Sequence, residues 1–388
     1  MQNVLVGSLA IPDSVLLRAR QVARDIGRAA AALGGSVQVD ADEILTGRAA
    51  ILGLKPAGLI SASGSTRLLA TRDDWCALTL SRAEDVETVP ALLESGPVAD
   101  PWAALAAAAA DRRAAELVER ARLLDLPAAV LGEVAPTAPK FARRGATAAR
   151  EVRELLVADL SSMWAGPLCG HLLAAAGATV VKVEGRNRPD GTRSGHPGFF
   201  NWMNSSKLSY AIDFRDEELR PLLEVADVVI EGSRPAALTR RGLGPDRVPG
   251  HPGRVWLRVT GYGSEGDRAN WIAFGDDAAV AGGLVGSAHA RSKTESSPVF
   301  VGDAIADPLT GMEATLAVLE ALGRGGGETV EISLAAVAAS YAALPSTATP
   351  DSGDEAPRVP EAAQRSAAVL GADNERVREL IETRHATC

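Results

Sequence analysis

Hydrophobic positions in the middle of the chain fall into short runs that are separated by amphipathic stretches. The runs are rich in β-branched residues, which is typical of buried strands. They predict strands at 155–160, 178–184, 209–214, 227–231 and 254–260. The stretches between them predict helices at 167–176, 216–225 and 235–241. This alternation predicts an α/β fold with a parallel, doubly wound, Rossmann-like sheet, whose ligands bind beyond the carboxyl ends of the strands.

The regions on either side of this pattern have a different character. Ahead of it the chain is rich in Ala, with helices predicted at 13–33 and 101–125 and a strand within 66–81. Behind it, a segment rich in Pro, Ser and acidic residues predicts a linker, followed by an amphipathic helix at 361–384. We therefore expect a smaller α+β unit, a nucleotide-binding core, a linker and a closing helix. The expected bounds are 1–150, 151–344, 345–360 and 361–388.

Composition narrows the classes of function. The formal net charge of −9 argues against binding to nucleic acid or to an anionic membrane surface. Between 182 and 215, however, six basic residues stand against three acidic ones. These basic residues are Lys182, Arg186, Arg188, Arg193, Lys207 and Arg215. They form either a solvated loop or a site for a ligand with several phosphates.

Several common kinds of site are disfavoured by the sequence. The turn after the first core strand, SSMWAGP, contains one glycine and no G-x-G-x-x-G, which argues against a nicotinamide dehydrogenase. The three cysteines and five histidines lack the spacing of a disulfide framework or a metal site. No apolar stretch reaches 18 residues, and no G-x-S-x-G motif is present. We expect a soluble cytoplasmic protein without a metal.

Five segments within 151–340 carry a resemblance to a known family. They are LLVADLSSMWAGPLCGHLLAAAGATVVKVEGRNRPDGTR, MNSSKLSYAIDF, ADVVIEGSRPAALTRRGLG, RVWLRVTGYGSEGD and IADPLTGMEATLAVLEAL. In this order and at this spacing they resemble the family III CoA-transferases, also called the CaiB/BaiF family, which include α-methylacyl-CoA racemase as a divergent branch. The resemblance implies transfer of CoA from an acyl-CoA to a carboxylic acid, with acyl-CoA as a substrate and no permanently bound cofactor. It also implies an interlocked homodimer.

The order of segments differs from the family outside this core. Family members place their small domain after the nucleotide-binding lobe, whereas the segment that looks like it here lies in front of the core. We interpret the chain as a rearranged member, with a separate N-terminal domain of other origin as the alternative.

Asp307, in IADPLTGMEATLAVLEAL, occupies the position of the family's catalytic carboxylate. A carboxylate can attack a thioester to form a mixed anhydride, which CoA thiolate then opens to an aspartyl-CoA thioester. A helix N-terminus favours the ionised nucleophile, and N–H groups near Gly311 or in the SSMWAGP turn are candidates for stabilising the oxyanion. The alternative is a purely structural N-cap followed by Pro at the first helical position. Asp303 is a second candidate carboxylate, but the TGM that follows Asp307 favours the latter.

The resemblance also implies contacts between CoA and four basic residues. They are Arg186, Lys207, Arg234 and Arg240, each of which is alternatively a surface cation.

Some positions depart from the family pattern. Leu208 stands where an Arg is usual, and Gly232 and Ser233 stand where Asn and Phe are common. Asp276 occupies the place of the racemase branch's catalytic His, which argues against racemisation. An acyl-CoA racemase or epimerase and a non-catalytic CoA-ester-binding subunit remain as alternatives.

Overall fold

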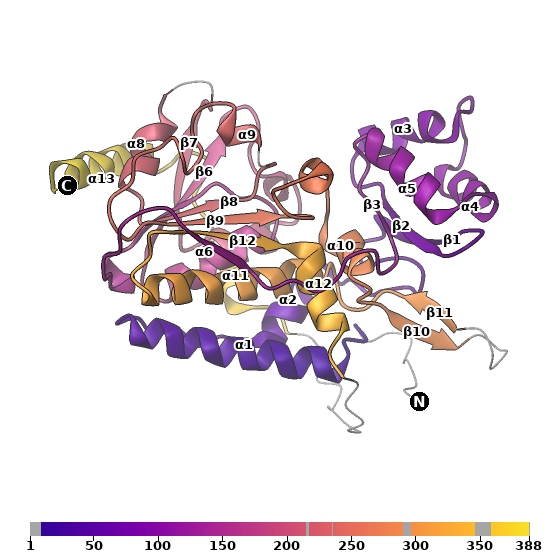
Figure 1. The fold of residues 1–388 in the computed structure, drawn as a ribbon, viewed down its shortest axis with the longest axis horizontal. Coiled ribbons are helices and arrows are strands. Elements are labelled where there is room, and N and C mark those ends of the chain that lie inside the picture. The colour runs from indigo at the N-terminus through magenta and orange to yellow at the C-terminus, as the bar shows by residue number, and fades with distance from the viewer. Residues whose placement is uncertain (1–8, 215–216, 235, 290–295, 346–357, 388) are drawn as a thin grey trace.

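The computed structural model describes residues 9–214, 217–234, 236–289, 296–345 and 358–387. A seven-stranded sheet forms its centre, with the strand order β4-β12-β9-β8-β5-β6-β7 (Figure 1). The strands are β4 (Lys140–Arg143), β5 (Leu156–Asp159), β6 (Thr179–Gly185), β7 (Leu208–Ile212), β8 (Val228–Glu231), β9 (Val255–Thr260) and β12 (Glu328–Ser333). All neighbours pair in parallel except β4, which runs antiparallel to β12 at the edge. The predicted parallel, doubly wound sheet is confirmed.

Successive side chains of the central strands point into two different cores. In β5, Val157 packs into one core, whereas Leu156 and Ala158 pack into the other. In β9, Leu257 packs into the first of these cores and Trp256 into the second. Because both faces of these strands are buried, the strands read as continuous apolar runs in the sequence.

Helices cover both faces of the sheet. The first core contains α6 (Ala165–Ala175), α11 (Ala306–Gly323) and α12 (Leu334–Ala342). α1 (Asp13–Ala32) lies across α11 on the side away from the sheet, beside α2 (Ala41–Leu52) (Figure 1). The opposite face carries α8 (Leu219–Val225) and α13 (Asn374–Thr387). The remaining helices of this part are α7 (Pro197–Asn204), α9 (Ala236–Thr239) and α10 (Gly275–Ala281).

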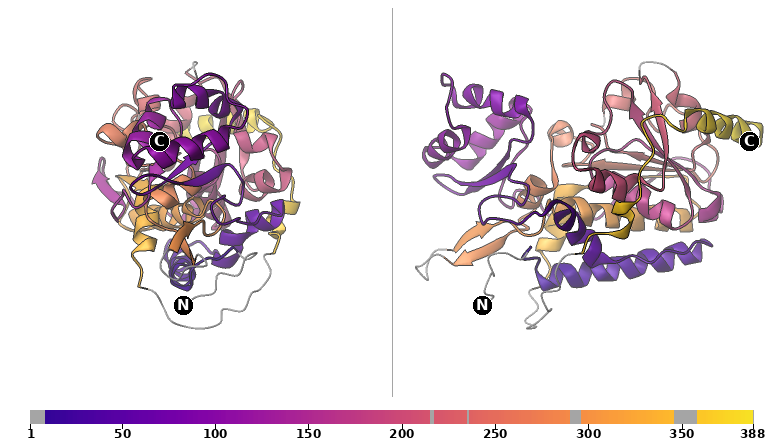
Figure 2. Two further views of the ribbon diagram at one scale, coloured as in Figure 1. Left: turned by 90° about the vertical axis from the view of Figure 1, so that its right-hand side faces the viewer. Right: turned by 180° about the vertical axis from the view of Figure 1, so that it is seen from behind.

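A smaller unit with its own core lies at the opposite end of the molecule from α13 (Figure 2). It consists of β1 (Thr66–Ala70), β2 (Trp75–Thr79), β3 (Ala128–Val130), α3 (Ala83–Leu93), α4 (Pro101–Asp111) and α5 (Ala114–Leu123). Its sheet has the order β1-β2-β3 and packs against α10. The hairpin of β10 (Gly286–His289) and β11 (Ser296–Val299) extends from the same end.

The structure differs from the sequence predictions in several elements. The predicted helix at 101–125 is two helices, because Arg112 adopts an extended conformation between them. The predicted strand at 66–81 is a hairpin of β1 and β2. The closing helix begins at Asn374 rather than at 361, after a short 3-10 turn at Glu361–Gln364. Most of the predicted linker lies outside the described residues.

The expected division at residue 150 stays a prediction. α1 and α2 contribute to the main core beneath α11, whereas 66–130 form the small unit. The N-terminal region therefore supplies parts of both cores. No helix among the described residues combines the length and the apolar character needed to span a membrane.

Gly311 allows α11 to pack closely against α6. A Cβ at this position would lie 2.7 Å from Leu168 Cδ2 and 2.8 Å from the Ala165 carbonyl oxygen. We expect Gly311→Ala to lower the free energy of unfolding by about 1–3 kcal/mol through overpacking. Gly323→Ala on the same helix, where a Cβ would meet nothing within 4 Å, should leave stability unchanged or slightly raised. Urea denaturation checks both variants, and equal stability of the two would contradict the prediction.

Candidate active site

Asp307 lies in the first turn of α11, at the carboxyl edge of the main sheet. α11 begins at Ala306 with Ile305 as its N-cap, and no side chain caps it. The structural alternative, in which Asp307 is the N-cap and Pro308 the first helical residue, is therefore wrong. Because α11 leads into the parallel strand β12, its N-terminus lies at the edge where the strands end. Asp307 thus stands where ligands bind in sheets of this kind.

The carboxylate of Asp307 accepts a hydrogen bond from a neighbouring helix. The Gly275 N–H, at the first residue of α10, donates to Asp307 Oδ2 at 3.1 Å. A Cβ on residue 275 would lie 2.5 Å from the same oxygen, so glycine is required for this close approach. Gly311, in contrast, lies inside α11 and faces α6 rather than the carboxylate. An N–H donor for an oxyanion near Asp307 is therefore better sought at residue 275 than at residue 311.

Three further carboxylates lie close to this site, and two of them, Asp276 and Asp303, act on the charge of Asp307. Asp276 and Asp277 belong to α10, and Asp303 precedes α11 by three residues. Asp276 accepts the Ala304 N–H at 3.0 Å, and Asp277 accepts the Phe274 N–H and the Thr79 hydroxyl. All three are buried, whereas Asp307 remains partly accessible. Asp307 is thus the member of the cluster that a substrate can reach.

Burial makes ionisation of these carboxylates costly. Loss of hydration raises the pKa of Asp307 to about 7, against the opposing influence of Arg48 and with a further increase from Asp276. It also raises the pKa of Asp276 to about 6 and that of Asp277 to about 8. From the sequence we expected the N-terminus of the helix to favour the ionised form of Asp307. Burial has a larger effect on its pKa and favours the protonated form.

The turn between β5 and α6 packs near the start of α11. Met163 adopts φ of 74°, and its side chain is 42% exposed. Its N–H donates to the buried carboxylate of Asp190, and Lys182 donates both to the Ser161 carbonyl and to Asp190 Oδ2, the latter at 2.8 Å. The sequence predicted this turn as part of the site, and the structure explains what fixes its backbone.

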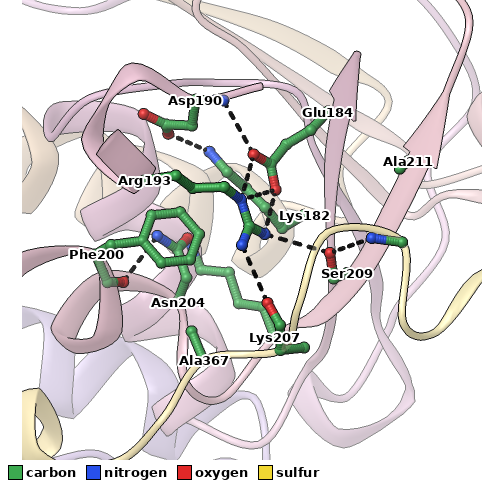
Figure 3. A network of polar contacts seen from close by, with 12 residues as sticks. Lys182, Glu184, Asp190, Arg193, Phe200, Asn204, Lys207, Ser209, Ala211 and Ala367 are labelled. Carbon is green, nitrogen blue, oxygen red and sulfur yellow. Dashed lines mark hydrogen bonds and ion pairs between the residues drawn. The ribbon is translucent and has the colours of Figure 1, made fainter. Parts of the chain in front are cut away.

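Figure 3 shows the wider network that holds this turn. Glu184 accepts the Asp190 N–H at 3.0 Å and pairs with Arg193 at 2.7 Å. The Arg193 guanidinium stacks on Phe200 and donates to the Ala368 carbonyl oxygen at 3.1 Å. The network therefore joins the turn at 161–163, strand β6 and the C-terminal segment.

Lys207 is fully buried in an ion pair. Its ammonium lies 2.8 Å from Asp159 Oδ2 and donates to the Pro167 carbonyl oxygen, also at 2.8 Å. Burial acts to raise the pKa of Asp159, but the charges of Lys207 and Lys182 lower it below its ordinary value. Lys207 supports the start of α6 from inside the protein, and the prediction that it contacts CoA gains no support from these bonds.

The other predicted CoA contacts lie on the surface. Arg186 pairs with Glu218, and Arg234 pairs with Asp125 at 2.9 Å. Arg240 is exposed and forms no hydrogen bond or ion pair with the described residues. None of these three shares a partner with another or with Lys207 in the part of the chain that the structure describes. Their role as CoA contacts stays a prediction.

The local excess of basic residues is largely neutralised within the fold. Lys182, Arg193 and Lys207 bind the buried carboxylates of Asp190, Glu184 and Asp159. Arg188 is exposed, and Arg215 lies outside the described residues. Charge counting in the sequence could not separate internal ion pairs from cations that face solvent.

Comparison with known proteins shows the family to which this chain belongs. The sequence model of CoA-transferase family III matches residues 152–372. The chain belongs to this family. The matched region contains Asp307, the turn after β5 and the α10 carboxylates, whereas α1, α2 and the small unit lie outside it.

Relatives within CoA-transferase family III share about 30% of the aligned residues. The succinyl-CoA–D-citramalate CoA-transferase of Chloroflexus aurantiacus is 31% identical over 204 residues, which are 48% of this chain and 49% of that protein. The succinyl-CoA:glutarate CoA-transferase of Mus musculus is 30% identical over 178 residues, covering 43% and 40%. A CAIB/BAIF family protein from Brucella suis has a TM-score of 0.43 and 28% identity, covering 50% of this chain and 55% of its own. The chain spans about half the length of the curated relatives it matches.

Sequence reasoning did not single out several residues around Asp307. Gly275 and Asp277 stand at the start of α10, and Arg48 comes from α2, and neither helix was predicted. The adjacent acidic pair Asp276–Asp277 ahead of an apolar helix was a usable signal. No local signal identifies Arg48, because its partner Asp303 is 255 residues away in the chain.

The raised carboxylate pKa values predict that stability falls with rising pH. Each group binds its proton more tightly when folded, so its stabilising contribution is complete below the unfolded pKa of about 3.9 and is lost as pH rises through the folded value. Between pH 5 and 8 we expect Asp277→Asn to make this loss shallower, by on the order of 1.4 kcal/mol per pH unit. Urea denaturation at each pH measures the effect. Asp111→Asn, at the exposed end of α4, should retain the wild-type slope, and a wild-type slope in Asp277→Asn would contradict the prediction.

The burial of Lys207 predicts a structural effect of its removal. Lys207→Met leaves the carboxylate of Asp159 unpaired, and we expect a loss of about 3–5 kcal/mol in the free energy of unfolding. Arg186→Met removes a half-exposed pair and should cost no more than about 1 kcal/mol. Thermal and urea denaturation test both. Wild-type stability in Lys207→Met, together with weakened CoA binding, would instead place Lys207 at the ligand.

Proposed function

We propose that this protein transfers CoA from an acyl-CoA to a carboxylic acid through a covalent intermediate on Asp307. The observation that carries the proposal is the position of Asp307, a partly accessible carboxylate at the carboxyl edge of the sheet with a backbone N–H donor beside it. Membership in the family supports the reaction class. The names of the relatives support a carboxylic acid as acceptor.

The chemistry runs through two anhydrides. The Asp307 carboxylate attacks the thioester carbonyl of the donor, expelling CoA thiolate and forming a mixed anhydride. The thiolate then attacks the Asp307 carbonyl of this anhydride, which releases the donor acid as a carboxylate and leaves an aspartyl-CoA thioester. The carboxylate of the acceptor acid attacks this thioester, which expels CoA thiolate and forms a second mixed anhydride between Asp307 and the acceptor. The thiolate then attacks the acceptor's carbonyl carbon, which gives the acyl-CoA of the acceptor and releases the Asp307 carboxylate.

The surroundings of Asp307 suit this sequence of steps. A pKa of about 7 leaves a substantial fraction of the carboxylate ionised at neutral pH. Incomplete solvation makes that anion more reactive than a carboxylate in water, because the loss of hydration disfavours its ground state. The Gly275 N–H holds one oxygen in place and leaves the other to attack.

The substrate class follows from the relatives and stays part of this proposal. Both relatives described above are named for succinyl-CoA, so succinyl-CoA with dicarboxylic acceptors is the first donor and acceptor set to test. The family resemblance further predicts acyl-CoA as a substrate without a resident cofactor, and a homodimer. Assembly and a cytoplasmic location stay predictions.

Asp307→Asn should abolish covalent turnover. We expect transferase activity to fall by at least about 10³-fold, since the amide cannot act as the nucleophile. Intact-protein mass spectrometry after incubation with succinyl-CoA should show a CoA-sized adduct on the wild type that hydroxylamine removes and that Asp307→Asn lacks. Glu320→Gln, an exposed site on the same helix, serves as the matched control and should behave as the wild type.

The same experiment distinguishes the alternatives. A wild type that forms no adduct with a panel of acyl-CoA esters, yet binds CoA, would contradict the transferase proposal and favour a CoA-ester-binding subunit. Exchange of α-deuterium from a chiral acyl-CoA, without CoA transfer, would instead favour a racemase.

A further inference from the structure

One cation opposes the negative charges of Asp276, Asp303 and the proposed nucleophile Asp307. Among the described residues, Arg48 of α2 is the basic side chain that bonds to this cluster, through an ion pair of 2.5 Å between its Nη1 and Asp303 Oδ1. The Asp303 side chain has no exposed surface, and that of Arg48 is 19% exposed. The second oxygen of Asp303 has no hydrogen-bond partner among the described residues. The charge of Asp303 is therefore balanced mainly by Arg48.

Arg48 is held in place by close packing. Its guanidinium carbon lies 5.4 Å from the ring centre of Trp164 and 5.3 Å from that of Phe199, and the two rings contact each other edge to face. At the preceding residue, Gly47, an added Cβ would lie 2.7 Å from Trp202, so the helix sits tightly against α7. Contacts with aromatic rings therefore hold the Arg48 guanidinium in place, unlike that of a flexible surface arginine.

Asp303 in turn belongs to the segment that sets the start of α11. Gly302 and Ala304, on either side of Asp303, both have positive φ, 67° and 43°, and the Ala304 N–H donates to Asp276. The Asp307 N–H donates to the Ala304 carbonyl oxygen at 2.9 Å. The ion pair therefore fixes a strained turn that is directly bonded to the residue carrying the proposed nucleophile.

We propose that Arg48 is the positioning residue of the active site, which fixes the turn at 302–304 through Asp303 and offsets the negative charge around Asp307. This inference rests on the proposed function and adds a residue outside the region that the family model matches, 152–372. The part of the chain ahead of the core then completes the site. Without the guanidinium, Asp307 would face the carboxylates of Asp276 and Asp303 with no opposing charge from the described residues.

The test is a charge cycle read by pH profiles. Arg48→Met should move the midpoint of the acidic limb of kcat/KM to a pH that is higher by about one unit or more. The reason is that an opposite charge nearby lowers a carboxyl pKa by roughly 1–3 units, and this variant removes that charge from beside Asp307. Asp303→Asn should shift the limb in the other direction, and the double variant should return towards the wild type. Arg48→Lys keeps the charge and should stay within about half a unit.

The matched control breaks an ion pair of another helix with α11. Arg18 of α1 pairs with Glu313 at 3.1 Å, and Arg18→Met should leave the pH profile unchanged. A merely structural role for Arg48 would lower the melting temperature of Arg48→Met without moving the limb. That result, or shifts of equal sign in Arg48→Met and Asp303→Asn, would overturn the inference.

A second readout does not need turnover. The protein is labelled with ¹³C-aspartate, and Asp307→Asn assigns the signal of the Asp307 carboxyl carbon. NMR titration should then give a pKa of Asp307 that is higher than in the wild type in Arg48→Met and lower in Asp303→Asn. If the wild type shows no transferase activity but the titrations move as expected, the proposed function fails and the positioning role stands. If activity is present and the titrations coincide with the wild type, the positioning role fails alone.

Discussion

The close packing of α6 against α11 is the contact on which the site depends. α6 begins at the end of β5, and α11 leads into β12, so their N-termini both lie at the carboxyl edge of the sheet. Gly311 allows the two helices to approach, because any side chain there would meet Leu168 and the Ala165 carbonyl. The approach brings the turn at 161–164 to the first turn of α11, where Asp307 lies. A parallel sheet supplies the edge, but this helix pair brings the two loops together.

Charge balance then divides the edge into two regions. Beneath the turn after β5, each buried carboxylate has a cation or N–H donors: Asp159 has Lys207, Asp190 has Lys182, and Glu184 has Arg193. These pairs lower the pKa of Asp159 and Asp190 and hold the backbone rigidly. Around Asp307 one guanidinium opposes the charges of three carboxylates, those of Asp276, Asp303 and Asp307, and burial raises the pKa of each. The first region fixes the backbone of the turn after β5. The second region keeps the pKa of the Asp307 carboxyl group near neutral pH. A perturbed acid beside a well-neutralised scaffold is typical of functional sites.

The main sheet could be predicted from the sequence, and Asp307 could be named as a candidate, because the signals for both are local. Strands β5, β6, β8 and β9 are largely buried and rich in apolar residues, although β6 also contains Lys182 and Glu184, and Asp307 stands in a motif of contiguous residues. β12 was missed because its sequence, ETVEIS, contains two glutamates and only two apolar residues, and Glu331 pairs with Arg258 of the neighbouring strand. The assignment of basic residues to CoA was less secure for a related reason. Whether Lys207 faces a ligand or Asp159 depends on contacts between residues 48 positions apart, which no window of sequence contains.

The N-terminal region shows how a site can extend beyond the part of the chain that carries its motif. α1 packs along α11, and α2 places the Arg48 guanidinium against the rings of Trp164 and Phe199. Both aromatic residues lie within the matched region, but they contact a cation that the matched region does not supply. A fragment of 152–372 alone would leave Asp303 buried without its partner, which is more costly than leaving an exposed pair unmade. The same electrostatics that place an ionisable carboxyl at Asp307 therefore require the segment ahead of the core to fold onto it.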